Sequence, residues 1–195
     1  MNFLRKLFRS FQESDKDKQI NKQPVNLSLD DSFVHHFINK GGKFLYSTKI
    51  DEVTVNLNHI LVENNWNEVV CNDFDLLTLL KKTKVKVVPT FKTGIPVFIP
   101  CEHLIANSGE ILLSSNQIGG NKLPSLSDDF IVYATTSQLV KNIGEGLTGI
   151  KMNFKGNIPT NICSIKKYVI SEVDDILSHG NSNSKNLYLL LFEDL

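Results

Sequence analysis

The run Phe130–Ala134 (FIVYA) constrains the fold more than any other part of the sequence. Five consecutive apolar residues, with β-branched and aromatic side chains among them, are typical of a strand that is buried on both faces. Strands of this kind belong to parallel sheets that helices cover on both sides. Leu187–Phe192 (LYLLLF) is a second such run. The sequence therefore predicts an α/β domain built around at least two buried strands.

The first half of the domain alternates helix-like and strand-like segments. Helices are expected to begin near Asp30, Asp51 and Asp73, and strand-like runs fall at 43–47, 68–71 and 85–89. Short connections between such segments are typical of a layered α/β domain with a mostly parallel sheet. The apolar segment 94–100 is bracketed by prolines, which predicts an edge strand or an extended connection.

A β-hairpin followed by a polar loop is expected in the middle of the chain. Strand-like runs at 103–106 and 110–114 flank Asn107-Ser108-Gly109, a tripeptide that readily forms a tight turn. The ten residues 115–124 are mostly polar and contain Gly119-Gly120, which predicts a loop. Backbone N–H groups of this loop could approach a phosphate or carboxylate, with Lys122 as the counter-charge.

The end of the strand at 130–134 is a second place where a ligand is expected. Thr135-Thr136-Ser137 offer an N-cap for a helix expected over 137–145, which glycines then end. Open α/β sheets place ligands at the carboxyl ends of their strands. Together with the hairpin and the glycine-bearing loop, this position makes a candidate site for a small molecule or an anion.

Charge and cysteine content exclude several classes of function. The formal net charge of zero argues against nucleic-acid binding by a broad basic surface. No apolar run approaches the ~20 residues of a membrane span, and no signal peptide is evident. The three cysteines form no CxxC pair, so no zinc site and no iron–sulfur cluster held by this chain alone is expected. The expected location is the cytoplasm, where thiols stay reduced.

Residues 1–24 differ from the rest, so two parts are expected: an N-terminal amphipathic arm and linker at 1–24, and a domain at 25–195. Apolar residues at helical spacing, among them Phe3, Leu7 and Phe11, face away from basic residues. The arm is expected to dock on the domain or on a second subunit, and the second arrangement would make a homodimer. The alternative is contact with a membrane surface or another partner.

The sequence around the hairpin resembles the LUD domain of lactate-utilisation proteins of the LutC/YkgG-like type. The residues that carry the resemblance are Glu102, Ile105–Glu110, Leu112–Ser114, Leu123–Leu126 and Ile131-Val132. The resemblance implies a Rossmann-like, open, mostly parallel sheet with helices on both faces and a β-hairpin insertion, as in the NagB/RpiA/CoA-transferase-like group. It also implies a part in lactate utilisation beside partner proteins that carry iron–sulfur clusters.

The sequence departs from this family at two places. Asn107 stands where relatives commonly have a glutamate before the turn. The stretch 157–165 lacks the arginine, aspartate and glutamate that relatives carry in the corresponding region. If that region binds an anion in relatives, this chain has lost the site or changed its ligand.

The candidate site residues come from three segments. The ligand-binding candidates, expected to hold a small anionic molecule, are Asn107, Ser108, Gly109, Ser114, Gly119, Gly120, Asn121, Lys122, Thr135 and Thr136. Glu110 is the candidate base or nucleophile, as a carboxylate is in the related CoA transferases. The simpler interpretation of Asn107–Gly109 is a tight turn without a role in chemistry. No metal site is expected.

Three functions follow from these observations. The first is an accessory or ligand-binding subunit in the use of lactate or related 2-hydroxy acids, acting with iron–sulfur oxidoreductase partners. The second is an enzyme of the isomerase or CoA-transferase type, acting on a phosphorylated or CoA-linked small molecule. The third is a degenerate family member with a structural or interaction role.

Overall fold

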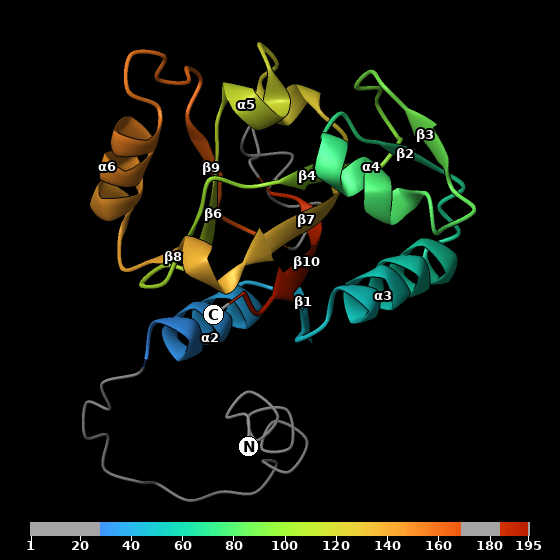
Figure 1. Cartoon of the computed structure of the whole chain (residues 1–195), viewed down its shortest axis with the longest axis horizontal. Coiled ribbons are helices and arrows are strands. Elements are labelled where there is room, and N and C mark those ends of the chain that lie inside the picture. The colour runs from blue at the N-terminus through green and yellow to red at the C-terminus, as the bar shows by residue number, and fades with distance from the viewer. Residues whose placement is uncertain (1–27, 169–183, 195) are drawn as a thin grey trace, which may run out of the picture.

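A six-stranded parallel sheet forms the centre of the computed structural model, which describes residues 28–168 and 184–194 (Figure 1). Its strands, in spatial order, are β1 (Lys43–Ser47), β10 (Asn186–Phe192), β7 (Asp129–Thr135), β4 (Val97–Pro100), β2 (Glu68–Val70) and β3 (Lys86–Val88). All five neighbouring pairs are parallel. The expected α/β class is therefore confirmed, whereas the arm at 1–24 lies outside the described residues.

Helices cover both faces of this sheet, and a second sheet lies on one of them (Figure 1). One face packs against α3 (Ile50–Glu63) and α4 (Phe74–Leu80). The other packs against α2 (Leu29–Asn39) and the second sheet, ordered β8 (Leu139–Val140), β5 (His103–Ile105), β6 (Glu110–Leu113) and β9 (Cys163–Ile165). The expected hairpin is the antiparallel pair of β5 and β6.

The alternation of side chains along β7 shows why an unbroken apolar run suits this position. Phe130, Val132 and Ala134 belong to the core shared with α2 and the hairpin. Ile131 and Tyr133 point to the opposite core, which α3 and α4 cover. Because successive residues of a strand face opposite sides, only a strand that is buried on both faces needs every residue to be apolar.

The expectation of an edge strand or extended connection at 94–100 is wrong. β4 lies inside the sheet, where Val97 pairs with Phe130 of β7 on one side and with Val70 of β2 on the other. Pro96 precedes the strand, and its carbonyl accepts a hydrogen bond from the Val70 N–H over 2.9 Å. Pro100 is the last residue of the strand. The two prolines lie at the ends of the strand, so they do not interrupt the central pairing.

The segments on either side of β7 also differ from expectation. The polar loop 115–124 contains the short helices α5 (Ser115–Ile118) and η1 (Leu123–Ser125). In place of a helix over 137–145, the chain forms η2 (Thr136–Gln138) and β8, and α6 (Ile143–Asn153) starts only after the N-cap Asn142. None of the described helices has the length and apolar character needed to cross a membrane.

The glycines expected to end that helix lie inside α6, where they allow close packing on the hairpin. A Cβ atom on Gly146 would lie 3.3 Å from side-chain carbons of Ile105 and Leu112. A Cβ atom on Gly149 would lie 2.8 Å from Nε2 of His103. The absence of these side chains therefore lets α6 cover the outer face of the second sheet.

Candidate functional site

The carboxyl edge of the parallel sheet is where the fold favours a site. β3 lies on one side of β2, and β4, the next strand after β3 in the sequence, lies on the other side. The strand order therefore changes direction between β2 and β4. Ligands of open α/β sheets bind at such a point, beyond the carboxyl ends of the strands. Polar residues follow four of the strands here: Asp73 after β2, Glu102 after β4, Thr136 and Ser137 after β7, and Asp194 after β10.

Asp194 ties the segment after β10 to the segment after β7. Its Oδ1 accepts hydrogen bonds from Thr136 Oγ1 over 2.8 Å and from the Ser137 N–H over 2.9 Å. Its Oδ2 accepts one from Ser137 Oγ over 2.6 Å, and Ser137 Oγ lies 2.9 Å from Thr135 Oγ1. The predicted residues Thr135 and Thr136 thus lie at the strand end, but the Thr136 hydroxyl already donates to the carboxylate of Asp194, which no sequence pattern pointed to.

The electrostatics of Asp194 disfavour a role in proton transfer. The loss of some hydration opposes its ionisation, but hydrogen bonds from Ser137, Thr136 and Thr135 outweigh this effect and lower its pKa to about 2. A general base works best with a pKa near the operating pH. Burial, followed by the charges of Asp194 and Asp75, raises the pKa of Tyr133. This end of the site therefore carries negative charge, which disfavours a small anion.

The Asp194→Asn variant tests this arrangement through the pH dependence of stability. The carboxyl pKa falls from 3.8 to about 2 on folding, so the charge stabilises the fold above pH 3.8 and ceases to do so as the pH falls through about 2. Because the side chain is exposed, we expect a loss of about 1 kcal/mol or less at pH 7. Urea unfolding at pH 7, 4 and 2.5 measures the difference in free energy of unfolding between wild type and variant, and we expect this difference to shrink as the pH is lowered. A constant difference would contradict the assignment.

Glu102 forms a second cluster at the start of α5. Its Oε1 accepts hydrogen bonds from Ser114 Oγ, from Asn116 Nδ2 over 2.9 Å and from Gln117 Nε2 over 3.1 Å. Ser114 is also the N-cap of α5, and its side chain accepts a hydrogen bond from the Asn116 N–H. The predicted residue Ser114 is therefore buried in a network that orders the start of α5.

Gln138 connects the two clusters. Its Nε2 donates to the Cys101 carbonyl over 2.6 Å and to the Glu102 carbonyl over 3.3 Å. Its Oε1 accepts from the Thr135 N–H over 2.8 Å. One amide thus fixes the end of β7 against the end of β4. Three of the predicted residues, Ser114, Thr135 and Thr136, belong to this continuous network.

The glycine-bearing loop lies beside the divergent stretch 157–165. Asn161 Nδ2 donates to the Asn121 carbonyl over 2.6 Å and to the Gly119 carbonyl over 3.5 Å. Ser115 and Thr160 exchange hydrogen bonds: the Ser115 N–H donates to the Thr160 carbonyl, and the Thr160 N–H donates to Ser115 Oγ. The four predicted residues 119–122 are exposed. The structure thus places the glycine-bearing loop 115–124 beside the stretch 157–165, which is distant from it in the sequence.

The hairpin turn makes its contacts with other elements. Gly109 has a φ of 65°, and a Cβ atom there would lie 2.5 Å from the backbone nitrogen of Phe37 in α2. The Asn107 N–H donates to the Lys141 carbonyl over 3.1 Å, and Ser108 follows in the same turn. Glu110 Oε2 accepts a hydrogen bond from Ser164 Oγ over 2.8 Å. These contacts pack the turn against α2 and the segments around Lys141 and Ser164.

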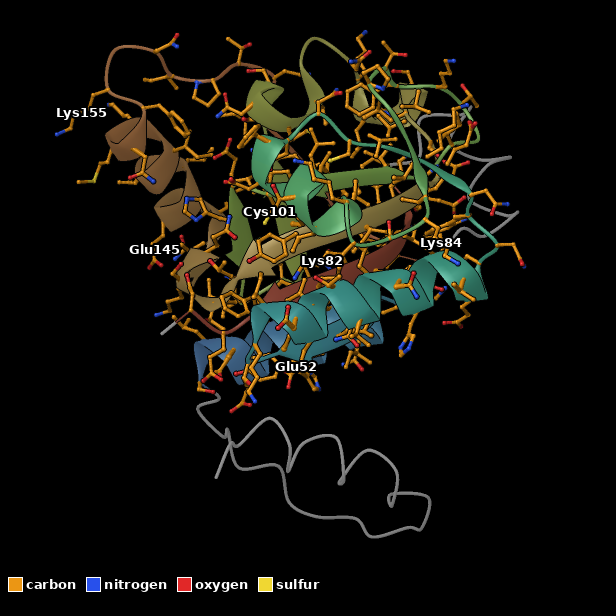
Figure 2. The ribbon with its side chains drawn as sticks, turned by 45° about the vertical axis from the view of Figure 1, so that its right-hand side comes forward. Glu52, Lys82, Lys84, Cys101, Glu145 and Lys155 are labelled. Carbon is orange, nitrogen blue, oxygen red and sulfur yellow. The ribbon has the colours of Figure 1, made fainter. Side chains whose placement is uncertain are left out.

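The two buried cysteines, Cys71 and Cys101, do not act as nucleophiles. Burial raises the pKa of Cys71 to about 11 and that of Cys101 still further, so neither thiol is a thiolate nucleophile near neutral pH. Cys101 lies among the strands at the centre of the ribbon in Figure 2, whereas Glu145 and Lys155 lie at its outer side. In the part of the chain that the structure describes, no three His, Cys, Asp or Glu side chains are grouped so as to hold a metal.

The fold and this edge define an α/β protein with a Rossmann-like open sheet. No protein-family model and no curated protein matches the chain. Its structure is similar to the crystal structure of a DUF162 family protein from Deinococcus radiodurans, with a TM-score of 0.59. The match covers 85% of this chain and 99% of that one, at 15% sequence identity. The two proteins therefore share a fold over nearly the whole length of the solved structure.

Proposed function

We propose that the chain is a LUD-domain protein that serves the utilisation of lactate or a related 2-hydroxy acid as an accessory subunit. The observation that carries this proposal is the fold shared with the DUF162 protein, because DUF162 is the LUD-domain family. The residues around the hairpin that resemble the family support it. Its partners would be oxidoreductase subunits that carry iron–sulfur clusters, and the free cysteines suit the reducing cytoplasm.

An accessory role fits the site better than catalysis does. An isomerase or a CoA transferase needs an acid–base pair or a nucleophilic carboxylate. Glu110 accepts a hydrogen bond from Ser164, Glu102 is bound to three side chains of the α5 region, and the pKa of Asp194 is about 2.

A small anionic ligand would find its counter-charge at Lys122, beside Gly119–Asn121, and not at the acidic end near Asp194.

Growth of a deletion strain tests the proposal. We expect loss of the gene to abolish or slow growth on lactate as sole carbon source, with growth on glucose unchanged, and a plasmid copy to restore it. Normal growth of the deletion strain on lactate would refute the role in lactate utilisation.

The Glu110→Gln variant then separates the accessory role from the enzymatic alternative. The amide oxygen of glutamine can still accept the hydrogen bond from Ser164, but an amide is neither a base nor a nucleophile. We therefore expect this copy to restore growth on lactate as well as wild type does. Failure of a normally expressed Glu110→Gln protein would instead favour the isomerase or CoA-transferase function.

A further inference from the structure

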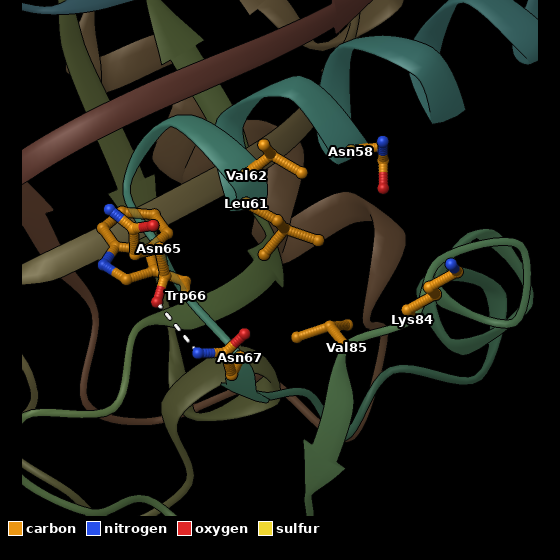
Figure 3. Close-up of a pocket in the computed structure, with 8 residues that line it drawn as sticks. All are labelled: Asn58, Leu61, Val62, Asn65, Trp66, Asn67, Lys84 and Val85. Atoms are coloured by element: carbon orange, nitrogen blue, oxygen red, sulfur yellow. Dashed lines mark hydrogen bonds between the residues drawn. The ribbon is translucent and has the colours of Figure 1, made fainter.

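A cavity of about 210 Å³ lies at the opposite edge of the parallel sheet, where α3 ends and where β2 and β3 begin (Figure 3). Leu61 and Val85 form its apolar centre, between Trp66 on one side and Lys84 on the other (Figure 3). Its volume equals that of about seven molecules of liquid water. There is room for one sugar ring.

The end of α3 builds this cavity. Asn65 has a φ of 55°, a conformation that asparagine adopts more readily than other residues with a side chain. It reverses the chain, so that the Trp66 N–H donates to the Leu61 carbonyl over 2.8 Å and the Asn65 N–H to the Val62 carbonyl over 3.1 Å. This pair of bonds is a Schellman motif. It places Trp66 next to Leu61, and the indole ring lies perpendicular to the ring of Tyr188, with ring centroids 6.0 Å apart.

The polar groups of the cavity are free to bind a ligand. Among the described residues, the side chains of Asn58 and Asn65 and the ammonium group of Lys84 have no hydrogen-bond or ion-pair partner. Asn67 uses only its Nδ2, which donates to the Asn65 carbonyl over 3.4 Å. The described lining residues include no aspartate or glutamate. The cavity therefore combines three carboxamides and one unpaired cation with an apolar centre.

We propose that this cavity binds a sugar acid, that is, a hydroxylated carboxylate of the size of one monosaccharide. Each carboxamide has donors and an acceptor, which suits neighbouring hydroxyl groups. The Lys84 ammonium group suits a carboxylate, and charge-assisted hydrogen bonds are about twice as strong as neutral ones. The C–H face of a sugar ring would cover Leu61, Val85 and the indole of Trp66. This site is separate from the carboxyl edge and does not depend on the proposed role in lactate utilisation.

The fluorescence of Trp66 provides a direct test, because it is the only tryptophan in the chain. The full chain is titrated with D-glucuronate, D-galacturonate and D-gluconate, and with D-glucose as the neutral counterpart. We expect a saturable change in fluorescence with at least one acid, and binding of glucose at least tenfold weaker. The absence of a saturable change with all three acids, or equal affinity for glucose, would overturn the proposal.

Lys84→Met and Lys86→Met form a matched pair of variants. Lys84 lines the cavity, whereas Lys86 is bound to Glu68 over 2.6 Å and does not line it. We expect Lys84→Met to weaken binding of the acid at least tenfold, and Lys86→Met to leave it within twofold of wild type. Both substitutions are on exposed side chains, and thermal unfolding checks that both variants are folded. Equal affinity of Lys84→Met and wild type would overturn the proposed recognition of the carboxylate.

Discussion

Replacement of Phe98 by alanine is expected to lower the free energy of unfolding by about 3–5 kcal/mol. Phe98 is fully buried, in the core that α3 and α4 cover. It belongs to β4, an inner strand with β7 on one side and β2 on the other. Truncation would leave a cavity that the neighbouring strands cannot easily close, because each is held by its own pairing. Urea unfolding followed by circular dichroism measures the loss as a lower midpoint at an unchanged slope.

Phe74→Ala is the matched control for this experiment. Phe74 is the first residue of α4 and is 80% exposed. Its removal takes little apolar surface from the core, so we expect a change within about 0.5 kcal/mol. A loss below about 1 kcal/mol for Phe98→Ala would contradict the central position of β4 and favour the edge strand that the prolines suggested.

Gly109→Ala is expected to cost about 2–5 kcal/mol, for two independent reasons. Gly109 has a φ of 65°, and residues with a Cβ atom pay about 1–2 kcal/mol in this left-handed region. The added Cβ atom would also lie 2.5 Å from the backbone nitrogen of Phe37 and 2.7 Å from the backbone carbon of His36. Backbone atoms of a packed helix cannot move aside singly, and overpacking of this kind costs about 1–3 kcal/mol.

Gly94→Ala separates these two contributions. Gly94 has a φ of 80°, but no atom lies within 4 Å of the position of its Cβ atom. We expect this variant to show only the conformational cost of about 1–2 kcal/mol. Thermal and urea unfolding of both variants would give the difference. If the two losses are equal, the hairpin turn does not pack closely against α2.

The central strands and helices could be predicted from the sequence because local patterns determine them. The uninterrupted apolar runs of β7 and β10 require burial on both faces, and both lie inside the sheet. The position of β4 inside the sheet could not be predicted. A proline shows only where a strand lacks a backbone N–H donor, and it does not show which strands lie beside that strand. The start of α6 cannot be predicted from N-caps alone, because Thr135 and Asn142 are both good N-caps. A start after Asn142 places Gly146 and Gly149 against the hairpin, where a side chain would not fit easily.

The candidate site was predictable only in part. Thr135 and Thr136 follow directly from the end of β7, where an α/β sheet is expected to place polar groups. Their partner Asp194 is 58 residues away from Thr136, and the bond from Gln138 to the Cys101 carbonyl spans 37 residues. No local pattern relates residues at such separations. The position of Glu102 could have been predicted in part, because it follows the apolar segment that forms β4. That segment, however, was expected at the edge of the sheet or outside it.

The position of β10 between β1 and β7 has a consequence for how the protein is made. Among the described strands β1 pairs only with β10, and the paired residues Lys43 and Tyr188 are 145 residues apart. Ribosomes add about 5–20 residues per second, so β1 waits roughly 7–30 s for its partner strand. During that time its edge is open to wrong partners, such as a strand of another nascent chain. Contacts so distant in sequence also slow folding after release, so we expect the nascent chain to depend on chaperones more than the finished domain does.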